Sequence, residues 1–309
     1  MNPEVITSAQ NPKLKRLIAL QEKSRLRREE GVFVVEGRRE LEHCVAAGFE
    51  IEAVFICPEI YVEPCGQALP PEGRNTRACT PENSHFPGAP RSIAGGPSRR
   101  DGGVSPKGEL PTGVMPAMQG QQFYLSKELY AKVAYREGTE GIIAEVKAKY
   151  LRLEDLKLKE NPLVMVLEGV EKPGNLGAVL RSADAAGADA VIICDPLTDL
   201  YNPNLIRASI GAVFTVPVVC CSSEEAIPFL KARGIRILTA QLQDSSPYYD
   251  VDMRCGTALV MGTEATGLTP VWRTAADAHI LIPMLGRLDS LNVSVSAAIL
   301  LFEAVRQRQ

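Results

Sequence analysis

Three short stretches of the chain gather polar and charged side chains where an apolar run has just ended. "EKPGNLGAVLRSADAAGA" carries Asn175 and Arg181, "VMGTEATGLTP" carries Glu264, and "IPMLGRLDSLNVSVS" carries Ser290 and Asn292. Amide, hydroxyl, carboxylate and guanidinium groups can hydrogen-bond a ligand, and an arginine in a mostly apolar helix needs an anionic partner. The glycines of the three stretches let backbone approach a ligand closely. We therefore expect polar recognition and electrostatic stabilisation at this site.

Each of these residues also has a purely structural interpretation. Asn175 fits the N-cap of a helix, and Arg181 fits an ordinary ion pair. Glu264 fits a turn closed by Pro270, and Ser290 fits the cap of the last helix. Capping alone explains one polar residue at a helix start, so "DSLNVS" favours an additional role for its polar side chains.

The sequence lacks the motifs of nucleotide-binding, metal-binding and redox sites. The first stretch matches neither G-x-G-x-x-G nor G-x-x-x-x-G-K-[ST], which disfavours the rival reading of a nucleotide-cofactor oxidoreductase. The eight cysteines form no C-x-x-C, and no histidine stands at zinc-ligand spacing. We expect no metal, and scattered reduced thiols.

The elements that position the three stretches are those of an α/β protein. In the second half, apolar runs such as "LVMVLEGV", "DAVIIC" and "GTALVMG" alternate with helical patterns, which predicts five or six parallel strands in an open, doubly wound sheet. Ligands of such sheets sit outside the carboxyl ends of the strands, where the three stretches lie. In the first half, 11–30 is expected to be a helix and Ser126 to cap another, among further strands and helices.

Composition divides the chain. From about 62 to 120 the sequence is crowded with Pro and Gly and has little apolar periodicity, which predicts a disordered insertion, or a segment that orders on RNA. We expect an α/β domain over 1–148 that contains this insertion, a linker over 149–160, and a second domain over 161–309.

The distribution of charge along the chain bears on its binding partner. The net charge is −3, but residues 10–28 carry seven cations against one acid, Glu22. This basic stripe fits either a polyanion-binding face or a solvated helix face. Its members are Lys13, Lys15, Arg16, Lys23, Arg25, Arg27 and Arg28. No apolar run is long enough to span a membrane and the N-terminus lacks a signal-peptide pattern, so we expect a cytoplasmic protein.

In this order, the motifs "EKPGNLGAVLRSADAAGA", "VMGTEATGL" and "IPMLGRLDSLNVSVSAAILLFEAVRQR" resemble the SpoU (TrmH) family of RNA ribose 2′-O-methyltransferases, of the SPOUT class. The resemblance covers 161–309. The first half is similar to the family's RNA-binding domain through "ITSAQNPKLKRLIAL", "VFVVEGRRELEHC" and "REGTEGIIAEV", and only about 62–120 falls outside the pattern.

The resemblance implies a deep trefoil knot in the C-terminal domain, S-adenosylmethionine as cofactor, and a homodimer with the active site near the subunit interface. It implies cofactor contacts, largely through backbone groups, at Thr239, Ala240, Gly262, Ile282 and Leu291. It also implies a polar catalytic set, which comprises Asn175, Arg181, Glu264, Ser290 and Asn292 and matches the family's positions.

The implied reaction moves a methyl group from a sulfonium to a ribose 2′-hydroxyl. Arg181 is not expected to act as the base, because a guanidinium stays protonated in proteins. We expect it to clamp an RNA phosphate and stabilise the developing alkoxide, with Asn175 and Glu264 ordering this arginine and the loops. Ser290 and Asn292 would order cofactor and substrate.

The expected substrate is 23S-type ribosomal RNA; the alternatives are tRNA, and a non-catalytic RNA-binding relative. The expected phosphate contacts lie in the basic stripe, at Lys13, Lys15, Arg16 and Arg25.

Overall fold

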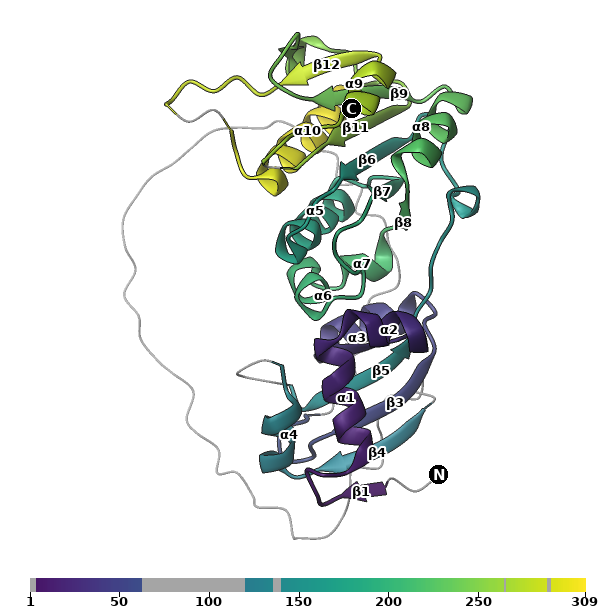
Figure 1. Cartoon of the computed structure of the whole chain (residues 1–309), viewed down its shortest axis with the longest axis vertical. Helices are drawn as coiled ribbons and strands as arrows, with labels where there is room; N and C mark the ends of the chain where they lie inside the picture. The colour runs from purple at the N-terminus through teal and green to yellow at the C-terminus, as the bar shows by residue number, and fades with distance from the viewer. Residues whose placement is uncertain (1–3, 63–119, 136–139, 264, 288–289) are drawn as a thin grey trace, which may run out of the picture. The chain divides into compact units, whose positions relative to one another are not determined.

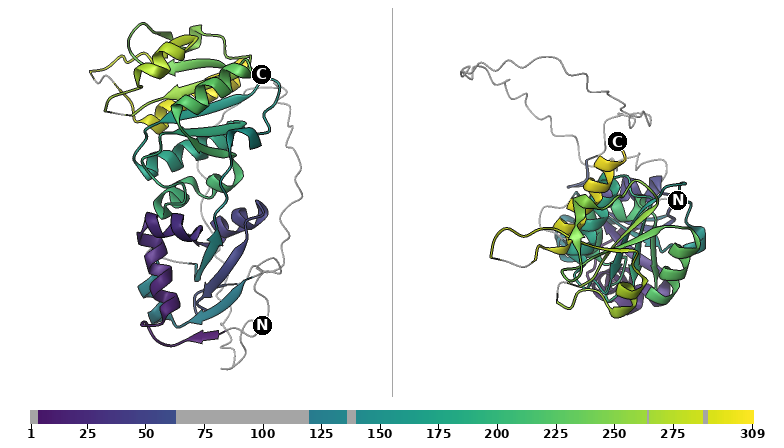
Figure 2. Two further views of the ribbon diagram at one scale, coloured as in Figure 1. Left: turned by 45° about the vertical axis from the view of Figure 1, so that its right-hand side comes forward. Right: turned by 90° about the horizontal axis from the view of Figure 1, so that it is seen from above.

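The structure, a computed structural model, describes residues 4–62, 120–135, 140–263, 265–287 and 290–309 (Figure 1). Its elements form two sheets, each with its own helices (Figures 1 and 2). Almost all of the predicted insertion at about 62–120 lies outside the described residues. The predicted domain boundaries at 148 and 161 stay predictions.

The first sheet has five strands in the order β1-β4-β3-β5-β2. Its strands are β1 (Glu4–Ile6), β2 (Val32–Glu36), β3 (Ile51–Ile56), β4 (Gln121–Leu125) and β5 (Ile142–Lys147). β4 pairs in parallel with β1 and β3, whereas β5 pairs antiparallel with β3 and β2. β2 and β3, although consecutive in the chain, are therefore not neighbours in the sheet, because β5 lies between them.

The helices of this half are α1 (Pro12–Glu22), α2 (Ser24–Glu30), α3 (Arg38–Ala46) and α4 (Lys127–Val133). The single helix predicted over 11–30 is wrong, because Lys23 takes an extended conformation that ends α1 and begins α2. Leu14, Leu17 and Leu20 of α1 are buried in the core of this half. Ser126 caps α4 as predicted, accepting a hydrogen bond from the Leu129 N–H.

The second sheet has seven strands, and every pair is parallel. Its order is β10-β12-β9-β11-β6-β7-β8, with bounds β6 (Leu163–Glu168), β7 (Ala190–Cys194), β8 (Val218–Cys221), β9 (Arg236–Ala240), β10 (Ser246–Pro247), β11 (Thr257–Met261) and β12 (Ala278–Leu281). The predicted α/β class with a parallel sheet is confirmed. The strand count was too low, because the two-residue β10 has no apolar run to reveal it.

The α-helices described beside this sheet are α5 (Pro173–Ala185), α6 (Pro203–Ser209), α7 (Ala212–Thr215), α8 (Ser223–Ala232), α9 (Pro270–Ala275) and α10 (Val293–Gln307). α10 packs against α5, β6 and β11, and α8 packs against α9, β7 and β9. All six residues of β6 are buried, as its continuous apolar run predicts for a strand covered on both faces.

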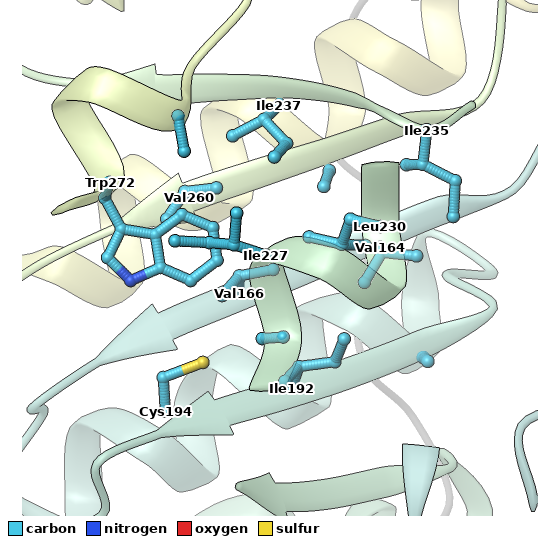
Figure 3. Packing of buried hydrophobic residues seen from close by; sticks show 14 of the residues in the cluster. Val164, Val166, Ile192, Cys194, Ile227, Leu230, Ile235, Ile237, Val260 and Trp272 are labelled. Carbon is cyan, nitrogen blue, oxygen red and sulfur yellow. The ribbon is translucent and has the colours of Figure 1, made fainter. Parts of the chain in front are cut away.

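One core of this half lies where α8 and α9 meet the sheet. Figure 3 shows Ile227 of α8 and Trp272 of α9 among strand residues such as Val166 and Val260. Trp272 is the one tryptophan of the chain and is completely buried. Within the described residues, no helix combines the length and the apolar character needed to cross a membrane.

Candidate active site

A cavity of about 570 Å³ opens at the carboxyl ends of β9, β11 and β12. Its described lining comes from 240–243, 261–263, 265–268, 280–282, 284 and 290–291, with further residues from α9 and α10. The second and third of the three polar stretches thus converge on one cavity. Its place agrees with the rule that parallel sheets bind ligands beyond their carboxyl edge.

One wall of the cavity is a tight turn after β11. Thr263 and Gly267 exchange two backbone hydrogen bonds, of 3.2 and 3.0 Å. A Cβ on Gly262 would lie 2.3 Å from the carbonyl carbon and oxygen of Gly267, so no larger residue fits there without opening the turn. Glycine at 262 thus permits the close approach of the two ends of this turn, and Gly262 itself lines the cavity. Glu264 lies outside the described residues.

The first and third stretches meet through two asparagines. The side chain of Asn292 donates from Nδ2 to Oδ1 of Asn175 at 3.2 Å. Asn292 also caps α10, because its Oδ1 accepts from the Ser294 N–H at 2.9 Å and from Ser294 Oγ at 2.6 Å. The two motifs, 117 residues apart, are thus joined by side chains.

Both capping interpretations based on the sequence were wrong. Pro173 is the first residue of α5 and Lys172 its cap, so Asn175 stands inside the first turn rather than before it. Proline is favoured at this first position, where its missing N–H costs nothing. At α10 the cap is Asn292, while Ser290 is exposed and lines the cavity.

Arg181 lies on α5, exposed, and within the described part of the chain it forms no ion pair. The ordinary ion pair considered for it is therefore absent there. Arg181 stands six positions after Asn175 in the helix, which turns their side chains about 120° apart around the axis. Arg181 is also not among the described residues that line the cavity.

Of the five expected cofactor contacts, four line the cavity: Ala240, Gly262, Ile282 and Leu291. Thr239 does not. It is fully buried, and its Oγ1 lies 2.6 Å from Nδ1 of His279 on the neighbouring strand β12. The role of all five as cofactor contacts stays a prediction.

Sequence reasoning missed a buried carboxylate at the end of β6. Glu168 is 4% exposed and accepts hydrogen bonds from the Thr269 N–H at 2.8 Å, Thr269 Oγ1 at 2.6 Å and Ser223 Oγ at 3.3 Å. Ser223 also accepts from Trp272 Nε1 at 2.9 Å and donates to Asp195 at 2.6 Å. A buried charge needs such donors. Glu168 thereby anchors the end of the turn that forms the cavity wall.

The basic stripe is partly neutralised within the chain. Arg16 forms ion pairs with Glu30, Glu52 and Glu145, the last of which is buried. Burial raises the pKa of Glu145 to about 7, although the nearby Arg16 charge lowers it.

The other members of the stripe differ in exposure. Lys13 pairs with Glu4 at 3.1 Å and Arg25 with Glu29 at 2.6 Å, and such exposed pairs are weak enough to exchange for a phosphate. Lys15 is exposed. Arg27 is only 2% exposed and is therefore not available at the surface.

Comparison with known proteins gives two family matches. Residues 162–302 match the SpoU rRNA Methylase family, and residues 11–82 match the MRM3-like substrate binding domain. The 23S rRNA (guanosine(2553)-2′-O)-methyltransferase RlmP of Bacillus subtilis (strain 168) is 32% identical over 194 residues, which are 63% of this chain and 74% of that protein.

Two solved structures cover nearly the whole chain. One, described as an RNA 2′-O ribose methyltransferase, is 31% identical with a TM-score of 0.71, and 99% of each chain is covered. The other, an rRNA methyltransferase from Sinorhizobium meliloti with bound AdoMet, is 24% identical with a TM-score of 0.75, covering 98% of this chain and 97% of that one. The second likeness concerns the fold alone.

Proposed function

Because the chain belongs to the SpoU rRNA methylase family, we propose that it transfers the methyl group of S-adenosylmethionine to a ribose 2′-hydroxyl of ribosomal RNA. The observation that carries the proposal is the cavity itself. It is lined by the second and third family motifs, and the Asn175–Asn292 hydrogen bond ties the first motif to the third.

The cavity fits the cofactor in size and lining. Its volume of about 570 Å³ falls within the range of small-molecule sites, roughly 300–1,000 Å³. Ile282 and Leu291 offer apolar surface for the adenosine, and Gly262, which has no side chain, can contribute only backbone groups to the lining. When bound, S-adenosylmethionine supplies a methyl group on a positively charged sulfur.

In the proposed mechanism, the chain's own groups orient the acceptor and stabilise its charge. Arg181 holds an RNA phosphate and stabilises the negative charge that develops on the 2′-oxygen in the transition state. Asn175 and Glu264 order the loops, and Ser290 and Asn292 order the cofactor and the ribose. The Asn175–Asn292 contact supports these roles, because one hydrogen bond restrains the beginnings of both α5 and α10.

The proposed assembly is a homodimer. Arg181 is exposed and does not line the described cavity of its own chain, so a second copy can bring it to the reaction. The outer face of α10 supports the same idea. Val295 and Phe302 are each 48% exposed, and a second copy would cover them.

We also propose the trefoil knot that the family resemblance implies. Its support is the sheet order, in which β11 lies between β9 and β6, two strands that precede it in the chain. After β10 the chain must therefore return to the middle of the sheet to place β11 between β9 and β6. α10 then packs back against α5 and β6, the elements with which this half begins.

The RNA-recognising part is proposed to be the first half, whose residues 11–82 match a substrate-binding family and contain the basic stripe. Lys15 and Arg25 are its exposed expected contacts. Ribosomal RNA is favoured over tRNA because the B. subtilis relative is a 23S rRNA enzyme. A ribosomal substrate also supports the expected cytoplasmic location.

The test is transfer of labelled methyl groups from S-adenosylmethionine to 23S rRNA, with tRNA as the competing substrate. We expect 23S rRNA to be labelled at ribose. Arg181→Ala should abolish transfer, at least 100-fold as for other lost transition-state donors, with little change in cofactor affinity. Near-normal turnover of that variant would refute the role of Arg181. Failure of the wild-type chain to label any RNA, despite binding it, would favour the non-catalytic alternative.

A further inference from the structure

We propose that Arg273 recognises the carboxylate of S-adenosylmethionine and so selects a cofactor with an intact amino-acid end. This inference rests on the proposed function and adds to it a residue outside the three motifs. It begins from a side chain at the cavity: Arg273, in α9, lines the cavity beside Gln241 and Gln243 of the segment after β9.

The guanidinium of Arg273 is held in a defined orientation. Its Nε donates to Oε1 of Gln241 at 2.9 Å, and its Nη2 donates to Oε1 of Gln243 at 2.8 Å. Gln241 is itself oriented, because its Nε2 donates to the Gln243 carbonyl at 2.9 Å. Two amide side chains from one loop thus position one planar cation.

These partners leave the charge uncompensated. Amide oxygens accept hydrogen bonds without carrying a negative charge, and Arg273 forms no ion pair within the described part of the chain. A guanidinium has five N–H donors, so two bonds to the glutamines leave three. Among the described residues that line the cavity, Arg273 is the one with a charged side chain. The result is an oriented cation at a ligand cavity.

The ligand proposed for this cavity has one group that suits such a cation. S-adenosylmethionine carries a sulfonium and an ammonium, which a guanidinium repels, and one carboxylate, which it binds well through paired N–H groups. An RNA phosphate is the other anionic oxygen group that this arginine could meet. The position of Arg273 among residues that line the cavity favours the small molecule.

The experiment compares two ligands by calorimetry on the full-length chain. Decarboxylated S-adenosylmethionine lacks only the carboxylate, so it reports on that group alone. We expect the wild type to bind S-adenosylmethionine about 10- to 100-fold more tightly than the decarboxylated ligand, as for a hydrogen bond to a charged group. Arg273→Gln should lose most of this preference, while its affinity for the decarboxylated ligand stays near the wild-type value.

Two further variants sharpen the result. Arg233→Gln is the matched control, since Arg233 lies over the Phe229 ring at 3.8 Å and does not line the cavity. It should keep the wild-type preference. Arg273→Lys should recover part of the preference, because it keeps the charge and loses the planar fork. If Arg273→Gln does not fold, Gln241→Ala with Gln243→Ala should show a smaller loss in the same direction.

The outcomes separate the inference from the proposed function. A wild-type chain that binds neither ligand contradicts the cavity as a cofactor site. Equal binding of both ligands by the wild type overturns the role of Arg273 alone. So does an Arg273→Gln variant that weakens both ligands equally, which is the mark of a structural role. Unchanged preference with weaker RNA binding would assign Arg273 to a phosphate and overturn the proposal.

Discussion

Gly177→Ala should destabilise the protein even though alanine is the better helix former. Gly177 lies in the middle of α5, between Asn175 and Arg181. A Cβ built there would lie 2.6 Å from the Ala208 Cβ, 2.7 Å from the Leu205 carbonyl oxygen and 2.8 Å from the Ser209 nitrogen. Two of these three atoms are backbone of α6, which cannot move aside as a flexible side chain can.

The expected magnitude follows from two opposing terms. Ordinary carbon–carbon contact begins near 3.5 Å, so α6 must retreat by roughly 1 Å. Such overpacking typically costs ~1–3 kcal/mol. Replacing glycine by alanine inside a helix returns up to about 1 kcal/mol. Because the clash is with backbone, we place the net loss at about 2 kcal/mol, near the upper part of the range that these terms allow.

Differential scanning calorimetry measures this loss, which corresponds to a fall in Tm of about 4–8 °C for a domain of 150–250 residues. The matched control is Gly174→Ala, three residues earlier in the same helix, where nothing lies within 4 Å of the added Cβ. It should leave Tm within about 1 °C of the wild type, since open surface sites change stability little. Equal effects of the two substitutions would contradict the close α5–α6 contact, as would a Gly177→Ala variant as stable as the wild type.

Two further predictions concern the first half. Burial raises the pKa of Glu145 from 4.5 to about 7, so its stabilising contribution is complete below 4.5 and is lost as pH rises through 7. The urea midpoint of unfolding should therefore fall between pH 5 and pH 8 for the wild type, relative to the midpoint of Glu145→Gln at the same pH. A difference between the two midpoints that does not change with pH would contradict this. Lys15→Ala should weaken rRNA binding and reduce the slope of log affinity against log salt by about 1, whereas Arg152→Ala, an exposed residue after the first sheet, serves as control and should leave the slope unchanged.

Sequence reasoning succeeded where the signal was local. Continuous apolar runs located strands buried on both faces, such as β6, and the rule that parallel sheets bind ligands beyond their carboxyl ends placed the stretches after β11 and β12 near a ligand site. It failed by a few residues at helix starts. Pro173 moved the beginning of α5 ahead of Asn175, and Asn292 took the capping position expected for Ser290. In each case two residues that favour a helix start lie within two positions of each other, and the sequence alone does not show at which of them the helix begins.

The remaining site residues were hidden because their partners are distant in the sequence. Glu168 is a charged residue at the end of an apolar run, a local signal that was not used, and its partner Thr269 is 101 residues away. Arg273 meets Gln241 across 32 residues. These contacts depend on which strands are neighbours, and strand order is a property of the three-dimensional topology that periodicity does not carry.

The late position of β11 has a consequence for synthesis. Its place beside β6 stays empty until the chain has been extended by about ninety residues beyond Glu168, which takes roughly 5–20 s at typical translation rates. During that interval β6 is an open, strongly apolar edge, the kind that recruits strands from other chains. The nascent chain, rather than the finished protein, is therefore the species most exposed to aggregation and most dependent on chaperones.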